Sequence, residues 1–528
     1  MQKIIFLACA ITASAITSAQ KNESFEPSKK VEVTAGETYR ESKGMTPSEI
    51  WASSESGFYV RKVKLGLGSR EIILAHYNRD LNLDFEVELD VEDIEKDRQF
   101  FEILEVGKKF IVLSTQKDKK KGTLTLYLNE LSATTLTLNP KSTKLGEISG
   151  ENAKDLRRSG FNTRISRDSS KFLIEHNLPF TKGEPERFEL NVFDDNLTRL
   201  WSKSIVLPYN DDLFSVNNYR VTNEGDVVVV GNLWRGKADT ERKEKNYKTI
   251  LITYEDQGAV TNEYEINLNG KLVSDINIAM TKEEVICAGF YLTLEKQGIQ
   301  GSFFVKLDRA SKSVIHESTK EFSVEFMKQD LTERQADKLE KKEEAGKDVG
   351  LSSNFDLHDF ILRNDGGVVM IAEYYNVVRT TTRTQQGTST TYTYYYNDLI
   401  VVSIDPKGNI EWASKIPKRQ ITTNDNGQFS SYLSAVVDDK IYIVFNDNPE
   451  NLAYNGDGKI DKMRIKDAFA SLVTIDSDGR IFREALMSTK VDKVIVQPKL
   501  SSQVAEDEVI LFAVRGKNKA FYKVKFKK

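Results

Sequence analysis

The chain has 528 residues, of which 39% are hydrophobic, 75 are basic and 79 are acidic. This length predicts more than one domain, unless one large repeat architecture uses all of it. The near balance of charge gives no reason to expect nucleic acid as a partner, and an aromatic content of 10% excludes general disorder. Two cysteines, Cys9 and Cys287, exclude a disulfide scaffold and a cysteine-based zinc site.

Residues 1–19 are typical of a secretory signal peptide. A lysine at position 3 precedes a short apolar run, and small residues lead to a cleavage site after Ala19. The run is too short to span a bilayer, and a lipoprotein cleavage at Cys9 is an alternative that would shorten it further. We therefore expect export to the periplasm or the extracellular space, with peripheral attachment to the outer membrane as a further option. No later segment is apolar enough to cross a membrane, and the mature chain, residues 20–528, is expected to form a single domain.

A repeat runs through the mature chain. Five windows of 18 residues align without a gap, each with an apolar run, an aspartate at the sixth position, turn residues and a second strand-like run; the aspartates are Asp194, Asp256, Asp308, Asp405 and Asp476. Asp at the first position of a turn accepts bonds from backbone N–H groups further on, and so closes a β-hairpin. We interpret these residues as turn formers rather than as acids or metal ligands. Two more windows carry Asn78 and Asn129 at the same place.

Upstream of each hairpin lies another apolar strand, and most of these strands are preceded by a further one. Four short antiparallel strands that recur roughly every 50–70 residues predict an all-β fold of the β-propeller type. There are eight second strands but only seven complete hairpins, so residues 29–34 are expected to supply the missing outer strand and close the ring. The prediction is eight four-stranded blades, with seven as the alternative if residues 51–63 belong to the closing blade.

Two insertions break the spacing. Residues 329–348 are highly charged and predict a short helix, with Thr332 and Gln335 as a capping box and Gly346 as its stop. The helix lacks a broad apolar stripe, which favours a solvated lid or spacer. Residues 380–398 are rich in Thr and Tyr and predict a hairpin extension of the sixth blade.

Two hairpins resemble the blades of quinoprotein-like propellers. In each, a tryptophan follows the Asp turn: Trp201 follows Asp194, and Trp412 follows Asp405. Other hairpins carry different residues there, and the single mature cysteine cannot form the adjacent-cysteine disulfide of the quinone dehydrogenases, so no cofactor is expected. The chain also looks like exported propeller proteins of Bacteroidota type. That resemblance covers most of the mature chain and implies a propeller in the cell envelope, without an activity.

The first candidate site lies on an innermost strand. Asp356, His358 and Asp359 belong to the segment DLHDFIL, which is expected to be the first strand of its blade. Its side chains would then point partly toward the central channel, where propellers often bind ligands. The alternative is a polar cluster at a strand end that local hydrogen bonds satisfy.

The second candidate is a row of tyrosines, Tyr392, Tyr394, Tyr395 and Tyr396, in the hairpin extension. Tyrosine offers flat, amphipathic contact area of the kind found in binding surfaces and sugar sites. Alternating Tyr and Thr is also ordinary strand composition, so packing within the fold is the alternative.

The third candidate is a loose cation site at Asn455, Asp457 and Asp461. The surrounding segment superficially resembles a calcium loop, but positions 453 and 464, Ala and Arg, replace the carboxylates that an EF-hand needs. Cys287 lies in an apolar run, where a thiol is expected to be a small buried hydrophobic group rather than a nucleophile.

Blade regularity, the signal peptide and the lack of a recognisable catalytic constellation favour a non-enzymatic envelope scaffold that binds a protein or a glycan. The alternative is a hydrolase or lyase acting on glycans or peptides through carboxylates in the channel, because propellers assemble such sites from scattered residues.

Overall fold

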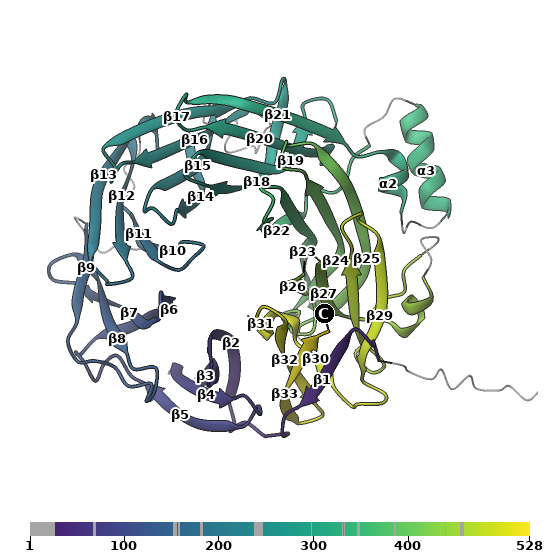
Figure 1. Cartoon of the computed structure of the whole chain (residues 1–528), viewed down its shortest axis with the longest axis horizontal. Coiled ribbons are helices and arrows are strands. Elements are labelled where there is room, and N and C mark those ends of the chain that lie inside the picture. The colour runs from purple at the N-terminus through teal and green to yellow at the C-terminus, as the bar shows by residue number, and fades with distance from the viewer. Residues whose placement is uncertain are drawn as a thin grey trace, which may run out of the picture.

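The computed structural model describes residues 27–527, except 67–69, 151–155, 157–158, 180–182, 237–245, 297, 330, 332, 346–348, 385–386, 439 and 455–458. The described chain forms eight antiparallel sheets that follow one another around a ring (Figure 1). The fold is therefore a β-propeller of eight blades, as the repeat count predicted, and the seven-blade alternative was wrong. The predicted signal peptide lies outside the described residues.

Seven blades are each built from four consecutive strands, with the first strand at the centre of the ring and the fourth at the rim. The strands of blades 1 to 3 are β2 (Met45–Ser54), β3 (Gly57–Leu65), β4 (Arg70–Asn78), β5 (Leu83–Leu89), β6 (Arg98–Val106), β7 (Lys109–Asp118), β8 (Thr123–Leu131), β9 (Thr143–Ser149), β10 (Gly160–Ile165), β11 (Lys171–Asn177), β12 (Pro185–Asp194) and β13 (Arg199–Asn210). Those of blades 4 to 7 are β14 (Phe214–Val221), β15 (Val227–Trp234), β16 (Tyr247–Glu255), β17 (Val260–Ile266), β18 (Lys271–Met280), β19 (Glu284–Thr293), β20 (Gly301–Asp308), β21 (Ser313–Glu321), β22 (Phe355–Leu362), β23 (Val368–Thr384), β24 (Gly387–Ile404), β25 (Ile410–Thr423), β26 (Leu433–Val437), β27 (Lys440–Asp447), β28 (Phe469–Ile475) and β29 (Ile481–Ser488).

The eighth blade joins the two ends of the chain. It contains β31 (Ser502–Ala505), β32 (Glu508–Arg515) and β33 (Asn518–Phe526), and the short β30 (Ile495–Val496) also pairs with β32. The outer strand is β1 (Val31–Ala35), which pairs antiparallel with β33 from Val31↔Phe526 to Ala35↔Tyr522. This is the closing strand that the sequence predicted, one or two residues further along. Closure covers the edge of β33, which would otherwise expose unpaired backbone groups.

The core consists of apolar layers between neighbouring blades. One layer, for example, packs Phe188 and Val192 of blade 3 against Val227 and Ile250 of blade 4. The second and third strands are buried on both faces, which explains why they read as continuous apolar runs instead of alternating.

The antiparallel order gives the ring two distinct faces. The turns between first and second strands, and between third and fourth strands, open on one face, which we call the turn face. The connections between second and third strands, and between blades, open on the opposite face, which we call the loop face. The long insertions lie on the loop face, whereas the turn face has short connections apart from residues 132–142.

The aspartate turns lie on the turn face and form as predicted. The Asp405 carboxylate accepts a bond from the backbone N–H of Asn409 at 2.7 Å, and Asp476 accepts one from Arg480 at 2.9 Å. Each turn carries a glycine with positive φ, Gly408 at 86° and Gly479 at 78°, the left-handed conformation that glycine adopts without strain.

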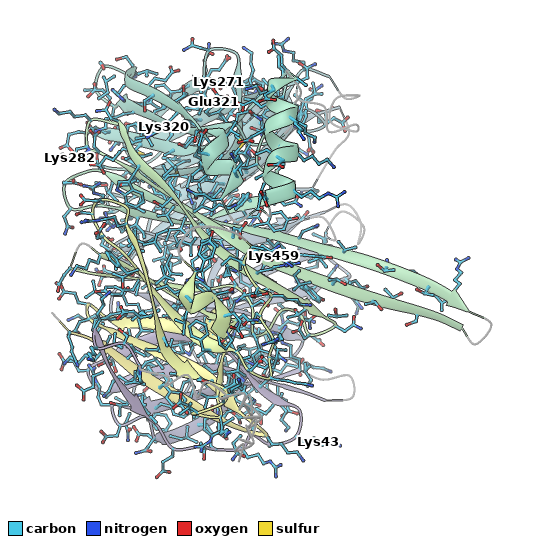
Figure 2. The ribbon with its side chains drawn as sticks, turned by 90° about the vertical axis from the view of Figure 1, so that its right-hand side faces the viewer. Lys43, Lys271, Lys282, Lys320, Glu321 and Lys459 are labelled. Atoms are coloured by element: carbon cyan, nitrogen blue, oxygen red, sulfur yellow. The ribbon has the colours of Figure 1, made fainter. Side chains whose placement is uncertain are left out.

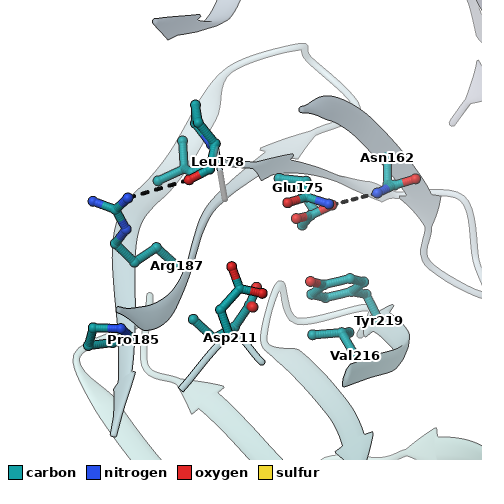
Figure 3. A pocket seen from close by; sticks show the side chains of 11 residues that line it. Asn162, Glu175, Leu178, Pro185, Arg187, Asp211, Val216 and Tyr219 are labelled. Atoms are coloured by element: carbon teal, nitrogen blue, oxygen red, sulfur yellow. Dashed lines mark hydrogen bonds between the residues drawn. The ribbon is translucent and has the colours of Figure 1, made fainter. Parts of the chain in front are cut away.

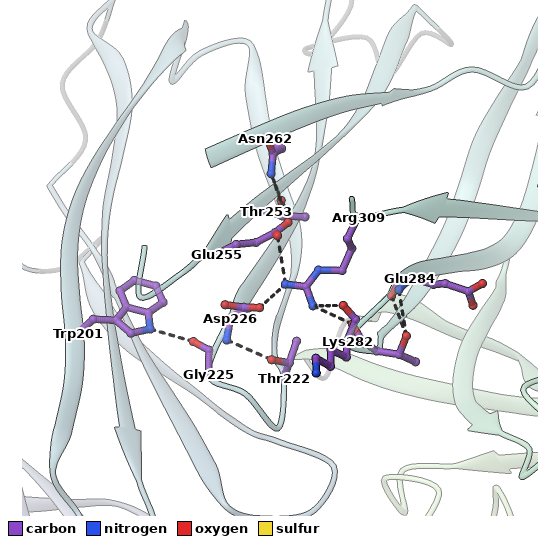
Figure 4. A network of polar contacts seen from close by, with 11 residues as sticks. Trp201, Thr222, Gly225, Asp226, Thr253, Glu255, Asn262, Lys282, Glu284 and Arg309 are labelled. Atoms are coloured by element: carbon purple, nitrogen blue, oxygen red, sulfur yellow. Dashed lines mark hydrogen bonds and ion pairs between the residues drawn. The ribbon is translucent and has the colours of Figure 1, made fainter. Parts of the chain in front are cut away.

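Neighbouring blades are joined across these turns. The Trp201 indole of blade 3 donates to the Gly225 carbonyl of blade 4 at 2.8 Å, and Trp412 of blade 6 donates to Ser477 of blade 7 at 2.9 Å. Between blades 4 and 5, the Arg309 guanidinium forms ion pairs with Asp226 and Glu255 (Figure 4). The tryptophans that follow the Asp turns thus act as contacts to the next blade.

Both predicted insertions are present. The charged segment contains α3 (Glu333–Glu344), and an unpredicted short helix, α2 (Val324–Lys328), precedes it. Phe326 and Met327 of α2 pack into the apolar layer beside blades 5 and 6. The predicted cap Thr332 and stop Gly346 lie outside the described residues. No helix in the described ranges is both long and apolar enough to cross a membrane.

Candidate functional site

The Thr/Tyr-rich insertion forms a two-stranded ribbon that projects from the ring. β22 pairs with β23 only as far as Tyr374, and β25 pairs with β24 only from Thr393 onward. Beyond these points β23 and β24 pair with each other alone, up to Thr384↔Gly387. Figure 2 shows the ring edge-on, with this long pale-green hairpin extending to the right. We call residues 375–395 the ribbon.

A buried polar network anchors the base of the ribbon. Lys418 of β25 and Glu373 of β23 form an ion pair of 2.6 Å, and both side chains are fully buried. The Lys418 ammonium also donates to the Gln420 side chain, and Ser431 donates to Glu373 at 2.7 Å. Burial lowers the pKa of Lys418, and the Glu373 charge opposes this shift. Because every member has a partner, the network holds β23, β25 and the connection to blade 7 in one arrangement.

The four predicted tyrosines lie at or near this base and differ in exposure. Tyr392 is 39% exposed, and the Tyr394 hydroxyl donates to Asn426 at 2.8 Å. Tyr395 is half-buried. Tyr396 is 8% exposed and packs against the ring of Tyr375 with centroids 4.8 Å apart, so it supports the base instead of offering contact area.

The predicted channel residues lie on β22, which is the innermost strand of blade 6. A bulge between Leu357 and Asp359 leaves His358 without a paired residue on β23, and both His358 and Asp356 are exposed. Asp359 accepts a hydrogen bond from the Tyr432 hydroxyl of the next connection at 2.8 Å. Burial raises the pKa of Asp356, and the His358 charge opposes this rise.

Similar bulges interrupt most innermost strands of the described chain. A polar residue follows five of these bulges, namely Glu49, Glu102, Asn218, Asp275 and Asp359, and an alanine follows the other two. Burial raises the pKa of Glu102 and of Asp275.

The predicted cation site cannot be placed as a whole. Asn455 and Asp457 lie outside the described residues, and Asp461 is exposed, with its backbone N–H donating to Asn451 at 2.8 Å. Within the described chain, no group of three or more His, Cys, Asp and Glu side chains has a metal-binding arrangement. Cys287 is completely buried, and burial raises the pKa of its thiol to about 12, which removes the thiolate that a nucleophile requires.

A cavity of about 290 Å³ on the loop face, between blades 3 and 4, was not predicted (Figure 3). Glu175 of β11 faces this cavity and is 2% exposed. Its carboxylate accepts a bond from Asn162 at 2.6 Å and another from the Tyr219 hydroxyl. Burial raises the pKa of Glu175 to about 7, although these hydrogen bonds and the charge of Arg164 oppose the shift.

A pair of carboxyl groups lines the same cavity. Glu186, at the start of β12, is hydrogen-bonded to Asp211, just after β13. Burial and the Asp211 charge raise the pKa of Glu186 to about 8, and burial also raises the pKa of Asp211. Two carboxyl groups this close cannot both ionise without strong repulsion, so the pair holds one proton near neutral pH. Arg187 stands at the rim, where its guanidinium donates to the Pro179 carbonyl at 3.4 Å.

Sequence reasoning missed this cavity because its residues come from four separate strands and their connections. Glu186 and Asp211 stand beside loops, where acidic residues are usually solvated. The one available signal was Glu175 itself, a carboxylate inside the apolar second strand KFLIEHN.

No family model matches the chain, and no curated protein matches it in sequence. Among solved structures, it is similar to the WD40 domain of SCAP from fission yeast, at 9% identity and a TM-score of 0.41, covering 94% of this chain and 95% of that one. It is also similar to the β-propeller domain of the Trilobed protease from Pyrococcus furiosus, at 11% identity and a TM-score of 0.36, covering 85% and 97%. A third similarity is to prolyl oligopeptidase B from Galerina marginata, at 10% identity and a TM-score of 0.34, covering 76% and 55%. The resemblance of two hairpins to quinoprotein-like blades, and that of the chain to exported proteins of Bacteroidota type, stay predictions from the sequence.

Proposed function

We propose that this propeller is an exported, non-enzymatic scaffold of the cell envelope that binds a protein or a glycan through its loop face. The observation that carries the proposal is the ribbon, which leaves the ring at a fully buried and fully bonded base. A long hairpin held at one angle offers contact area at little cost in conformational entropy on binding. The turn face, in contrast, has short connections whose side chains serve the contacts between blades.

The residues proposed to contact the ligand are the exposed or half-buried ones among the candidates. Tyr392, Tyr394 and Tyr395 lie on the ribbon, and Asp356 and His358 lie on the central strand of the same blade. The Asp359 carboxylate, which accepts from Tyr432, would help to fix the bulge that presents His358. A cation bound by Asn455, Asp457 and Asp461 stays part of the proposal.

The test removes the outer part of the ribbon, including Tyr392, and keeps its base and the blade. Replacing residues 379–392 by Asn-Gly leaves Val378 paired with Thr393 and joins them by a favoured two-residue turn. The shortened protein should melt like the original and lose its stoichiometric partner in a pull-down from native envelope fractions. A control with Glu224→Lys on the turn face should keep the partner. Retention of the partner by the shortened protein would contradict the proposal.

The envelope location has its own test, because it rests on the predicted signal peptide and on the resemblance to exported propeller proteins. Sequencing the N-terminus of the protein from its native cell should begin at Gln20, and cell fractionation should recover it outside the cytoplasm. A full-length N-terminus in the cytoplasm would contradict export and leave the binding test unaffected.

One observation favours a second candidate function, a peptide-directed hydrolase. Glu186 and Asp211 share a proton in a cavity, as the paired carboxyl groups of acid proteases do. In that case Asp211→Asn would abolish hydrolysis of a peptide substrate library while the fold persists. The absence of hydrolysis by the wild-type protein between pH 4 and 8 would leave the scaffold as the function.

A further inference from the structure

We propose that the cavity between blades 3 and 4 binds a cationic group, a primary ammonium or a guanidinium, carried by a small molecule or a peptide side chain. The inference concerns a site other than the ribbon, and it stands whether or not the ribbon binds a partner. The cavity, of about 290 Å³, is large enough for an alkylammonium or a lysine side chain.

The first argument compares three buried carboxylates on second strands. Glu373 in blade 6 and Asp447 in blade 7 are both fully buried. Each has a cation of its own: Lys418 lies 2.6 Å from Glu373, and Arg483 lies 2.8 Å from Asp447. Glu175 in blade 3 is buried to nearly the same degree but faces the cavity instead. Buried carboxylates in proteins are normally paired, so the cavity occupies the place where a cation belongs.

The second argument is the charge around the cavity. In the described chain, no lysine or arginine nitrogen forms an ion pair with Glu175, Glu186 or Asp211, and each of these carboxyls has a raised pKa. The charge of Arg164 lowers the pKa of Glu175, and the charge of Arg187 lowers those of Glu186 and Asp211, but in each case burial raises the pKa more. The neighbouring Asp212 raises the pKa of Asp211 further. Three carboxyl groups with raised pKa values line one cavity. A positively charged ligand there would favour their ionised forms, which indicates a cation-binding site.

The third argument selects the kind of cation. The described side chains form no metal-binding group of three or more acidic or histidine residues, so a metal ion does not fit. Glu175 offers one buried carboxylate to the cavity, and the half-buried pair Glu186 and Asp211 offers two more carboxyl groups. Figure 3 shows Glu175 and Asp211 on the cavity wall. An ammonium or guanidinium group donates several hydrogen bonds in different directions and can use both.

The test measures binding of n-butylammonium and of the blocked peptide acetyl-Ala-Lys-Ala-amide by calorimetry at pH 6.0 and pH 8.5. Cation binding needs ionised carboxyls, and a group with a pKa of about 8 loses about tenfold in affinity per pH unit below that value. We expect affinity at least about tenfold higher at pH 8.5 than at pH 6.0, with protons released on binding. If the peptide binds and n-butylammonium does not, the cation comes from a peptide side chain. If both probes bind, small free amines are also ligands of the site.

Glu186→Gln imitates the protonated acid and should weaken binding at pH 8.5 by about tenfold and flatten its pH dependence. Glu224→Gln, an exposed carboxylate on the turn face, should change nothing. Equal binding of uncharged n-butanol, affinity that does not rise with pH, or equal behaviour of the two variants would overturn the proposal. Thermal melting of both variants confirms that each is folded during the measurement.

Discussion

Single glycines decide how closely two blades can approach. A Cβ atom at Gly408 would lie 2.2 Å from a ring carbon of His316 and 2.6 Å from Phe304, both in the preceding blade. Gly366 has nearly the same backbone, with φ of 88° against 86° for Gly408, but its Cβ would meet open space. An alanine at Gly366 would therefore add backbone strain only, whereas an alanine at Gly408 would add the same strain and a steric clash with the preceding blade.

We predict that Gly408→Ala destabilises the protein by about 2 kcal/mol more than Gly366→Ala does, because only the first adds a clash to the left-handed strain. Chemical denaturation of both variants checks the difference. Equal losses would mean that blade 6 shifts to admit the methyl group.

Buried acids in the cavity make stability depend on pH. The folded-state pKa values of Glu175 and Glu186 are about 7 and 8, above the value of about 4.3 in an unfolded chain. The folded state therefore binds more protons than the unfolded state in this range, and stability falls as pH rises from about 4.5 to 8.

We predict that Glu186→Gln raises the melting temperature at pH 8 and has little effect at pH 4.5, where the wild-type acid is already neutral. Melting curves across this range test the sign, with Glu224→Gln as the control. A variant less stable than the wild type at pH 8 would contradict the assigned cost of burial.

Among the elements of the fold, the base of the ribbon is stabilised by the buried ion pair of Lys418 and Glu373. Removing one partner of a buried pair leaves an uncompensated charge, which typically costs about 3–5 kcal/mol. An exposed pair, such as Lys248 with Glu265, contributes about 1 kcal/mol or less.

We predict that Lys418→Met lowers the stability of the fold strongly and that adding Glu373→Gln recovers part of the loss, because Gln keeps a bond partner for Ser431. Lys248→Met should have a small effect. Unfolding monitored by circular dichroism compares the three, and a double variant no more stable than Lys418→Met would show that the charge is not the cause.

The sequence predicted the strands themselves because apolar runs and Asp turns are local signals. It also predicted the positions of both insertions from composition. It did not predict that Tyr396 is buried while Tyr392 is exposed, since both sit in the same alternating pattern and only the packing of Tyr375 and the connection to blade 7 distinguishes them.

At the scale of the whole molecule, the ring is held by five residues of β1. Deleting residues 27–35 exposes the edge of β33 and opens the apolar layer that contains Val31 and Phe526.

We predict that this deletion lowers the melting temperature and causes concentration-dependent association through the free edge. Light scattering after size-exclusion chromatography measures the association, and a chain that begins at Pro27 is the control. A deletion variant that stays monomeric and equally stable would mean that closure contributes little.

The class of fold and the strand that closes the ring follow from the sequence, because both depend on patterns within a few tens of residues. The choice of eight blades over seven required the folded structure, and so did the identity of the carboxylates that have a cation or face a cavity. Glu175, Glu373 and Asp447 look alike in their apolar strands. The cations that pair with Glu373 and Asp447 come from residues far along the chain, whereas no cation of the described chain forms an ion pair with Glu175. The electrostatics of a buried acid are set by its neighbours in space.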